Sequence, residues 1–175
     1  MLKILKKHRR NIKRKLFYRK LINKGNLCYD IGANLGKKSK IFLQLGARVI
    51  AFEPQSSCIK ELSKIKEGNF QFYQLAVGSN NETKELNLAN HIEIATFSQK
   101  FINYFETKNI SWNKTETVEV KTLNSLIELH GIPDFCKIDV EGYEWEILSV
   151  LAPEIPVIEF EFTANFLRKK CFDIF

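Results

Sequence analysis

The 175-residue sequence predicts an α/β fold built on a doubly wound, mostly parallel β-sheet. Three observations predict it. Short apolar segments alternate with segments of helical spacing, a Gly-rich turn follows the first apolar segment, and a Glu-Pro pair ends the second. This alternation is typical of βαβ units with right-handed crossovers. We therefore expect a Rossmann-like sheet with its strands in the spatial order 3-2-1-4-5.

The expected strands are the five apolar segments 26–31, 48–52, 70–75, 135–140 and 156–162. The expected helices are the segments 38–45, 57–65, 123–130 and 144–151. Thr122 is a suitable N-cap for the third helix, and Gly131 follows its last residue. Residues 76–121 are less regular, and there we expect short strands at 84–88 and 118–120 and a helix at 98–107.

The positive charge is concentrated at the N-terminus. Residues 1–24 contain 11 of the 27 Lys and Arg residues and no acid, so the other 151 residues have a formal charge of −4. Residues 2–22 predict a basic amphipathic helix with Leu5, Ile12, Leu16 and Phe17 near one face. We expect this arm to pack on a domain formed by residues 25–175. Contact with an anionic membrane surface is an alternative, and contact with nucleic acid is a less favoured one.

Composition narrows the class of protein. No apolar run approaches the roughly 20 residues needed to span a bilayer, and no apolar stretch follows the basic N-terminus as in a secretory signal. The four cysteines lie far apart, which favours buried thiols in a reducing compartment over a disulfide framework. We expect a cytoplasmic protein.

Small and acidic residues follow the expected strands. They are Asp30, Gly32 and Gly36 after the first strand, Glu53 after the second, Ala76 and Val77 after the third, and Asp139 and Glu141 after the fourth. Ligands of open α/β sheets bind beyond the carboxyl ends of the strands. We therefore expect these residues to surround one binding site.

The two carboxylates at the first two strand ends indicate the kind of ligand. A Gly-rich turn alone is also typical of phosphate binders. However, a carboxylate at Asp30 would repel a pyrophosphate and suits a ligand with an ammonium or sulfonium group. Glu53, 23 residues later, can accept hydrogen bonds from both hydroxyls of a ribose. The pair predicts a positively charged cofactor that contains ribose.

Several motifs resemble FkbM-type methyltransferases, which are class I enzymes that use S-adenosylmethionine. They are YDIGANLG (29–36), AFEP (51–54), LAVGS (75–79), KTLNSL (121–126) and, most specifically, KIDVEGYEWEIL (137–148). The resemblance implies that the turn residues Asp30, Gly32, Ala33, Asn34 and Gly36 line the methionine part of the cofactor. It also implies that Glu53 binds the ribose, that Ala76 and Val77 flank the adenine, and that Asp139, Glu141 and Gly142 lie nearest the methyl group.

The resemblance implies an O-methyltransferase that acts on a hydroxyl of a sugar or another small metabolite. Such an acceptor needs a nearby base, and Asp139 and Glu141 are the candidates. These carboxylates, with Glu159 or Glu161, could hold Mg²⁺, but nothing in the spacing requires a metal and we expect none. The alternatives are a non-catalytic cofactor-binding domain, an NAD-dependent dehydrogenase and a nucleic-acid methyltransferase.

The chain continues only briefly beyond the fifth expected strand. Class I methyltransferases usually add a helix and an antiparallel hairpin there, whereas only residues 163–175 follow here. We therefore expect a truncated domain without the hairpin and with an exposed sheet edge. An exposed edge can pair with another chain, so a homo-oligomer through this edge is a further expectation.

Overall fold

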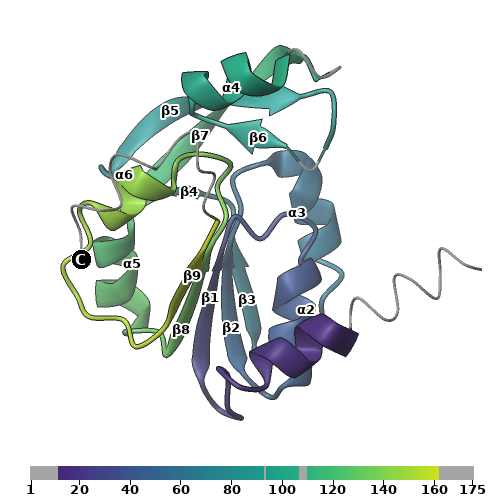
Figure 1. Ribbon diagram of the computed structural model, residues 1–175, viewed down its shortest axis with the longest axis vertical. Helices are drawn as coiled ribbons and strands as arrows, with labels where there is room; N and C mark the ends of the chain where they lie inside the picture. The colour runs from purple at the N-terminus through teal and green to yellow at the C-terminus, as the bar shows by residue number, and fades with distance from the viewer. Residues whose placement is uncertain (1–11, 93, 107–109, 162–175) are drawn as a thin grey trace, which may run out of the picture.

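The computed structural model describes residues 12–92, 94–106 and 110–161. A five-stranded sheet forms the centre of the molecule, with helices on both of its faces, and a second sheet lies across one end (Figure 1). The central sheet has the order β3-β2-β1-β8-β9, with strands β1 (Leu27–Ile31), β2 (Arg48–Phe52), β3 (Phe70–Tyr73), β8 (Phe135–Ile138) and β9 (Ile158–Phe160). All neighbouring pairs are parallel, which confirms the predicted fold class and strand order.

The central strand β1 is buried along its whole length, as expected of a strand with helices on both faces. Its side chains alternate between two hydrophobic clusters. Tyr29 and Ile31 pack in one cluster, together with Leu126 and Ile147. Cys28 packs in the other, together with Phe42.

Two pairs of helices cover the sheet (Figure 1). Helices α2 (Lys37–Gln44) and α3 (Ser56–Leu62) lie on one face, and α5 (Leu123–His130) and α6 (Glu144–Leu148) lie on the other. The Thr122 side chain accepts a hydrogen bond from the backbone N–H of Ser125, and Gly131 ends α5 with φ 93°. Both expected ends of α5 are thus confirmed.

Residues 76–122 are more regular than expected. They form a second sheet of order β4-β7-β5-β6, with strands β4 (Ala76–Gly78), β5 (Glu82–Ala89), β6 (Ala95–Thr96) and β7 (Trp112–Thr122), and helix α4 (Gln99–Phe105). The expected third strand, 70–75, was too long, because β3 ends at Tyr73 and residues 74–75 link it to β4. The expected strands at 84–88 and 118–120 were too short. Only one face of this sheet packs on apolar residues, so charged side chains interrupt the apolar pattern along β5 and β7.

The N-terminal arm packs on the domain through residues other than those predicted. Residues 12–18 are helical, but Ile12, Leu16 and Phe17 are about half exposed. Tyr18 and Ile22 are buried instead, and the Tyr18 ring packs edge-on against Phe42 and Phe135. The apolar stripe was misplaced because it was chosen by helical spacing, whereas the apolar residues that pack on the domain, Tyr18 and Ile22, lie at the end of the helix and just beyond it. Leu5 lies outside the described residues.

Strand β9 is the last element of the described chain and forms one edge of the central sheet. Residues 162–175, on which the expectation of a missing hairpin depends, lie outside the described residues. Cys28, Cys58 and Cys136 are buried and form no disulfide with one another, as predicted. Among the described residues, no helix combines the length and the apolar character needed to cross a bilayer.

Candidate functional site

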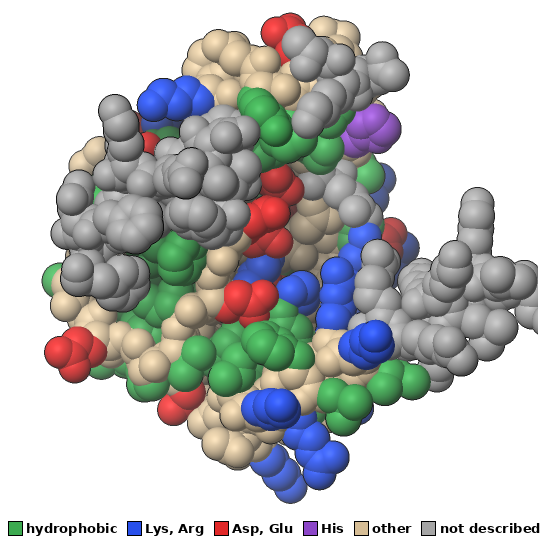
Figure 2. Space-filling view, in the orientation of Figure 1, with side chains coloured by type: hydrophobic (Ala, Val, Ile, Leu, Met, Phe, Trp, Pro, Cys, Tyr) green, Lys and Arg blue, Asp and Glu red, His purple; other side chains and the backbone are tan. Residues whose placement is uncertain are grey.

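One cavity of about 330 Å³ opens at the carboxyl ends of β1, β2 and β8, beneath the second sheet. Figure 2 shows acidic side chains gathered in the hollow at the centre of this face, with basic ones beside them. Eight of the predicted site residues line the cavity: Gly32, Ala33, Asn34, Glu53, Ala76, Val77, Asp139 and Glu141. Residues from four strand ends are therefore brought together, as the sequence predicted.

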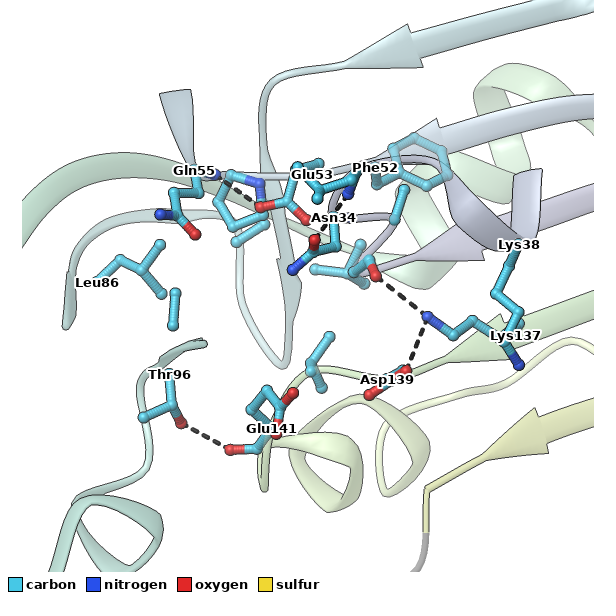
Figure 3. Close-up of a pocket in the computed structure, with 18 of the residues that line it drawn as sticks. Asn34, Lys38, Phe52, Glu53, Gln55, Leu86, Thr96, Lys137, Asp139 and Glu141 are labelled. Atoms are coloured by element: carbon cyan, nitrogen blue, oxygen red, sulfur yellow. Dashed lines mark hydrogen bonds and ion pairs between the residues drawn. The ribbon is translucent and has the colours of Figure 1, made fainter. Parts of the chain in front are cut away.

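Glu53 joins the turns that follow β1 and β2. Its carboxylate accepts a hydrogen bond from the backbone N–H of Asn34 at 2.7 Å and another from that of Gln55 at 2.9 Å (Figure 3). The side chain is only 5% exposed, and burial raises the pKa of its carboxyl although both N–H groups oppose the shift. Each carboxylate oxygen has a further lone pair that a ligand in the cavity can use.

The turn after β8 is held from two sides. Glu144 is buried at the start of α6, and its carboxylate accepts hydrogen bonds from the backbone N–H groups of Val140 and Gly142. From the second sheet, the Thr96 hydroxyl donates to the Glu141 carbonyl oxygen at 2.7 Å (Figure 3). Glu141 itself has a positive φ of 54°, which is uncommon for a residue other than glycine. These contacts fix the turn in a conformation that places Glu141 in the cavity wall.

Three carboxylates meet beside this turn. Single oxygen atoms of Asp139, Glu141 and Glu161 all lie within 4.8 Å of one another. Burial, followed by repulsion from Asp139 and Glu161, raises the pKa of Glu141 to about 8. Glu159 belongs elsewhere, because its carboxylate accepts a hydrogen bond from Tyr18 and pairs with Lys38. The expectation that no metal binds here stays a prediction.

Asp30 lies behind the cavity, outside its lining. Its side chain has no exposed surface, accepts a hydrogen bond from the Ser39 hydroxyl at 2.6 Å, and pairs with Lys137. The prediction of direct contact with a ligand therefore has no support from this geometry. Asp30 faces the same side of β1 as Cys28, against α2, because side chains alternate along a strand.

Gly36 also lies outside the lining. It begins α2 with φ 70°, and a Cβ at this position would lie 2.9 Å from side-chain atoms of Leu62 and Ile65. Gly32, by contrast, lines the cavity and touches the neighbouring strand end. A Cβ on Gly32 would lie 1.9 Å from the backbone oxygen of Asp139. Gly36 therefore serves helix packing, and Gly32 lets the ends of β1 and β8 approach each other.

The structure adds residues that the sequence did not single out. They are Lys137 within β8, Phe52 and Gln55 around Glu53, Leu86, Thr96 and Phe97 from the second sheet, and Arg14, Lys37 and Lys38 at the side of α2. Of these, only Lys137 had a clear signal, since a lysine inside an apolar core strand needs a buried partner. The second-sheet residues could not be assigned to the site without that sheet.

The cavity has an apolar part and a charged part. Leu75, Ala76, Val77 and Leu86 provide apolar wall on the side of the second sheet, whereas Asp139, Glu141 and Lys137 form a charged floor at the end of β8. Glu53 lies across the cavity from Asp139 and Glu141 (Figure 3). The site therefore suits a ligand that combines an apolar ring, hydroxyls and a charged end.

A family of known proteins matches most of the chain. Residues 30–174 match the family model of the methyltransferase FkbM domain. No curated protein matches the chain. Among solved structures, the chain is similar to a provisionally assigned methyltransferase from an antibiotic biosynthesis pathway of Anabaena variabilis ATCC 29413, with 22% sequence identity and a TM-score of 0.34. That similarity covers 37% of this chain and 26% of the other protein.

Proposed function

Because the chain belongs to the FkbM methyltransferase family, we propose that it transfers a methyl group from S-adenosylmethionine to a hydroxyl of a small molecule, a sugar or another metabolite. The observation that supports this proposal best is the position of Glu53. Its buried carboxylate lies at the end of β2, between the turn after β1 and the apolar wall, where a ribose with two hydroxyls would fit.

The residues present suit each part of this cofactor. Leu75, Ala76 and Val77 form an apolar surface for adenine. Glu53 accepts hydrogen bonds from the ribose hydroxyls, and Asn34 lies beside it in the turn after β1. Asp139 offers a carboxylate toward the amino-acid end. When bound, S-adenosylmethionine supplies a methyl group on a sulfonium, which is a good leaving group.

The chain then has to align the acceptor and remove its proton. Alignment of the acceptor oxygen with the methyl carbon and the sulfur can contribute several kcal/mol. Glu141 is the better base, because a pKa of about 8 lies near neutral pH and the carboxylate can take the hydroxyl proton as the oxygen is methylated. Asp139 is paired with Lys137, which suits it to position a ligand.

Calorimetric titration tests the cofactor. The wild-type chain should bind S-adenosylmethionine and not NAD, and Glu53→Gln should weaken that binding about tenfold or more, because a neutral amide replaces a charged acceptor. Lys121→Met is a matched control, since Lys121 pairs with Glu119 on the surface of β7, away from the cavity. Binding of NAD alone would contradict the proposal.

Methyl transfer is tested separately. When the methyl group of S-adenosylmethionine is isotopically labelled, the label should appear in at least one member of a panel of sugars and hydroxylated metabolites. Glu141→Gln should strongly reduce the rate of this transfer. Binding of the cofactor without transfer to any acceptor would favour a non-catalytic cofactor-binding domain.

A further inference from the structure

Lys137 is a buried cation that contacts both sides of the cavity floor. Its side chain is 4% exposed, and its Nζ lies 3.1 Å from Asp139 Oδ2 (Figure 3). The same Nζ lies 3.1 Å from the carbonyl oxygen of Gly32 and 3.4 Å from Asp30 Oδ1. One ammonium group therefore joins the turn after β1 to the end of β8. The ammonium donates a hydrogen bond to the Gly32 carbonyl and forms ion pairs with both carboxylates; Asp30 Oδ1, at 3.4 Å, accepts no hydrogen bond.

Asp30 and Asp139 contribute to this arrangement in different ways. Asp30 is fully buried and holds the ammonium from behind, with its other oxygen bonded to Ser39. Asp139 is on the cavity side, with a side chain 37% exposed. Burial by itself would lower the pKa of Lys137, but the two carboxylates outweigh burial and raise it, so the group stays charged.

Asp139 needs such a partner because two other carboxylates crowd it. Glu141 and Glu161 offer oxygens within 4.8 Å of an Asp139 oxygen. Wherever these carboxyl groups are ionised they repel Asp139, so an unrestrained Asp139 side chain would turn away from them. In the described part of the chain, Lys137 is the cation that pairs with Asp139.

We propose that Lys137 is a positioning residue, which Asp30 orients from behind and which holds the Asp139 carboxylate in the geometry that binds the cofactor. The inference rests on the proposed function, and it gives Asp30 an indirect role in place of the predicted direct contact. Lys137 acts through Asp139 and does not itself touch the reacting atoms.

A variant that removes Lys137 alone could lose cofactor binding merely because the protein is less stable. Lys137→Met would leave Asp30 charged, buried and unpaired, which is strongly destabilising. The double variant Asp30→Asn/Lys137→Met removes both buried charges and avoids that penalty. Asp30→Asn alone is its reference, and Asp139→Asn in both backgrounds completes a double-mutant cycle.

The dissociation constant for S-adenosylmethionine, measured by calorimetry, is the main readout. In the Asp30→Asn background, Lys137→Met should weaken binding about tenfold or more, which is the value of a charge-assisted hydrogen bond. When Asp139 is already Asn, the same change should weaken binding less than about twofold. An equal loss in both backgrounds, or no loss in the first, would overturn the inference.

A crystal structure of Asp30→Asn/Lys137→Met without ligand tests the inference independently of the cofactor. The Asp139 carboxylate should move away from its wild-type position, whereas an unchanged position would overturn the positioning role. If the wild-type chain fails to bind S-adenosylmethionine, the proposed function fails, and the crystal structure still decides whether Lys137 positions Asp139.

Discussion

Replacement of Gly32 by alanine tests how closely the ends of β1 and β8 must approach. Gly32 has φ 70°, and its Cβ would lie 1.9 Å from the backbone oxygen of Asp139. A left-handed conformation costs a residue with a Cβ about 1–2 kcal/mol. The overlap is with backbone, which cannot rotate away, so the strands must separate at a further cost of about 1–3 kcal/mol. We expect Gly32→Ala to lose about 2–5 kcal/mol of the free energy of unfolding.

Gly25→Ala separates the two contributions. Gly25 also has a positive φ, 89°, but a Cβ there would meet nothing within 4 Å. This control should lose only the conformational part, about 1–2 kcal/mol. Urea unfolding followed by circular dichroism gives both free energies under the same conditions. If the two variants are equally stable, the close approach of β1 and β8 does not contribute to stability and the reasoning is wrong.

Three further predictions concern the acids and the N-terminal helix. The turnover of the wild-type chain should rise with pH up to about 8, because Glu141 must lose its proton to act as a base, and Glu141→Gln should remove this rise in a pH–rate profile. The folded state binds that proton more tightly than the unfolded state, so stability should fall as the pH rises toward about 8. Thermal unfolding of Glu141→Gln should show a smaller fall. Tyr18→Phe should lose about 1 kcal/mol of the free energy of unfolding, because it removes the hydroxyl that donates to Glu159. Tyr18→Ala should lose about 3–5 kcal/mol, because it also leaves a cavity at a buried position. Equal losses for the two variants in urea unfolding would show that the buried ring does not contribute to stability.

The middle of the central sheet was predictable because β1, β8 and most of β2 are buried. Phe135, Cys136 and Ile138 form a nearly continuous apolar run in β8, and such runs stand out from a single sequence. The second sheet was not predictable in the same way. In β5, Leu86 packs inward between exposed Glu85 and half-buried Asn87, so local patterns describe only a fraction of each strand. The full length of both strands is fixed by the antiparallel pairing of β5 with β7, which connects residues far apart in the sequence.

Some residues of the site were predictable from the sequence, and others were not. Glu53 and Asp139 were predictable because parallel strands end at a common edge. The position of the Asp30 side chain was not, since proximity to the Gly-rich turn does not say on which face of β1 the side chain lies. Its contact with Lys137 on β8 joins two residues that are far apart in the sequence. Thr96 reaches the site through the second sheet, which no local pattern indicated.

The position of β1 between β2 and β8 has a consequence for synthesis on the ribosome. β2 is made soon after β1, but β8 comes much later: Leu27 and its hydrogen-bond partner Asp134 are 107 residues apart. At about 5–20 residues per second, one edge of the fully buried strand β1 stays unpaired for roughly 5–20 s. During that interval the nascent chain exposes a strand edge that other chains could join. Production of the folded protein should therefore depend on the speed of translation and on chaperones that cover this edge.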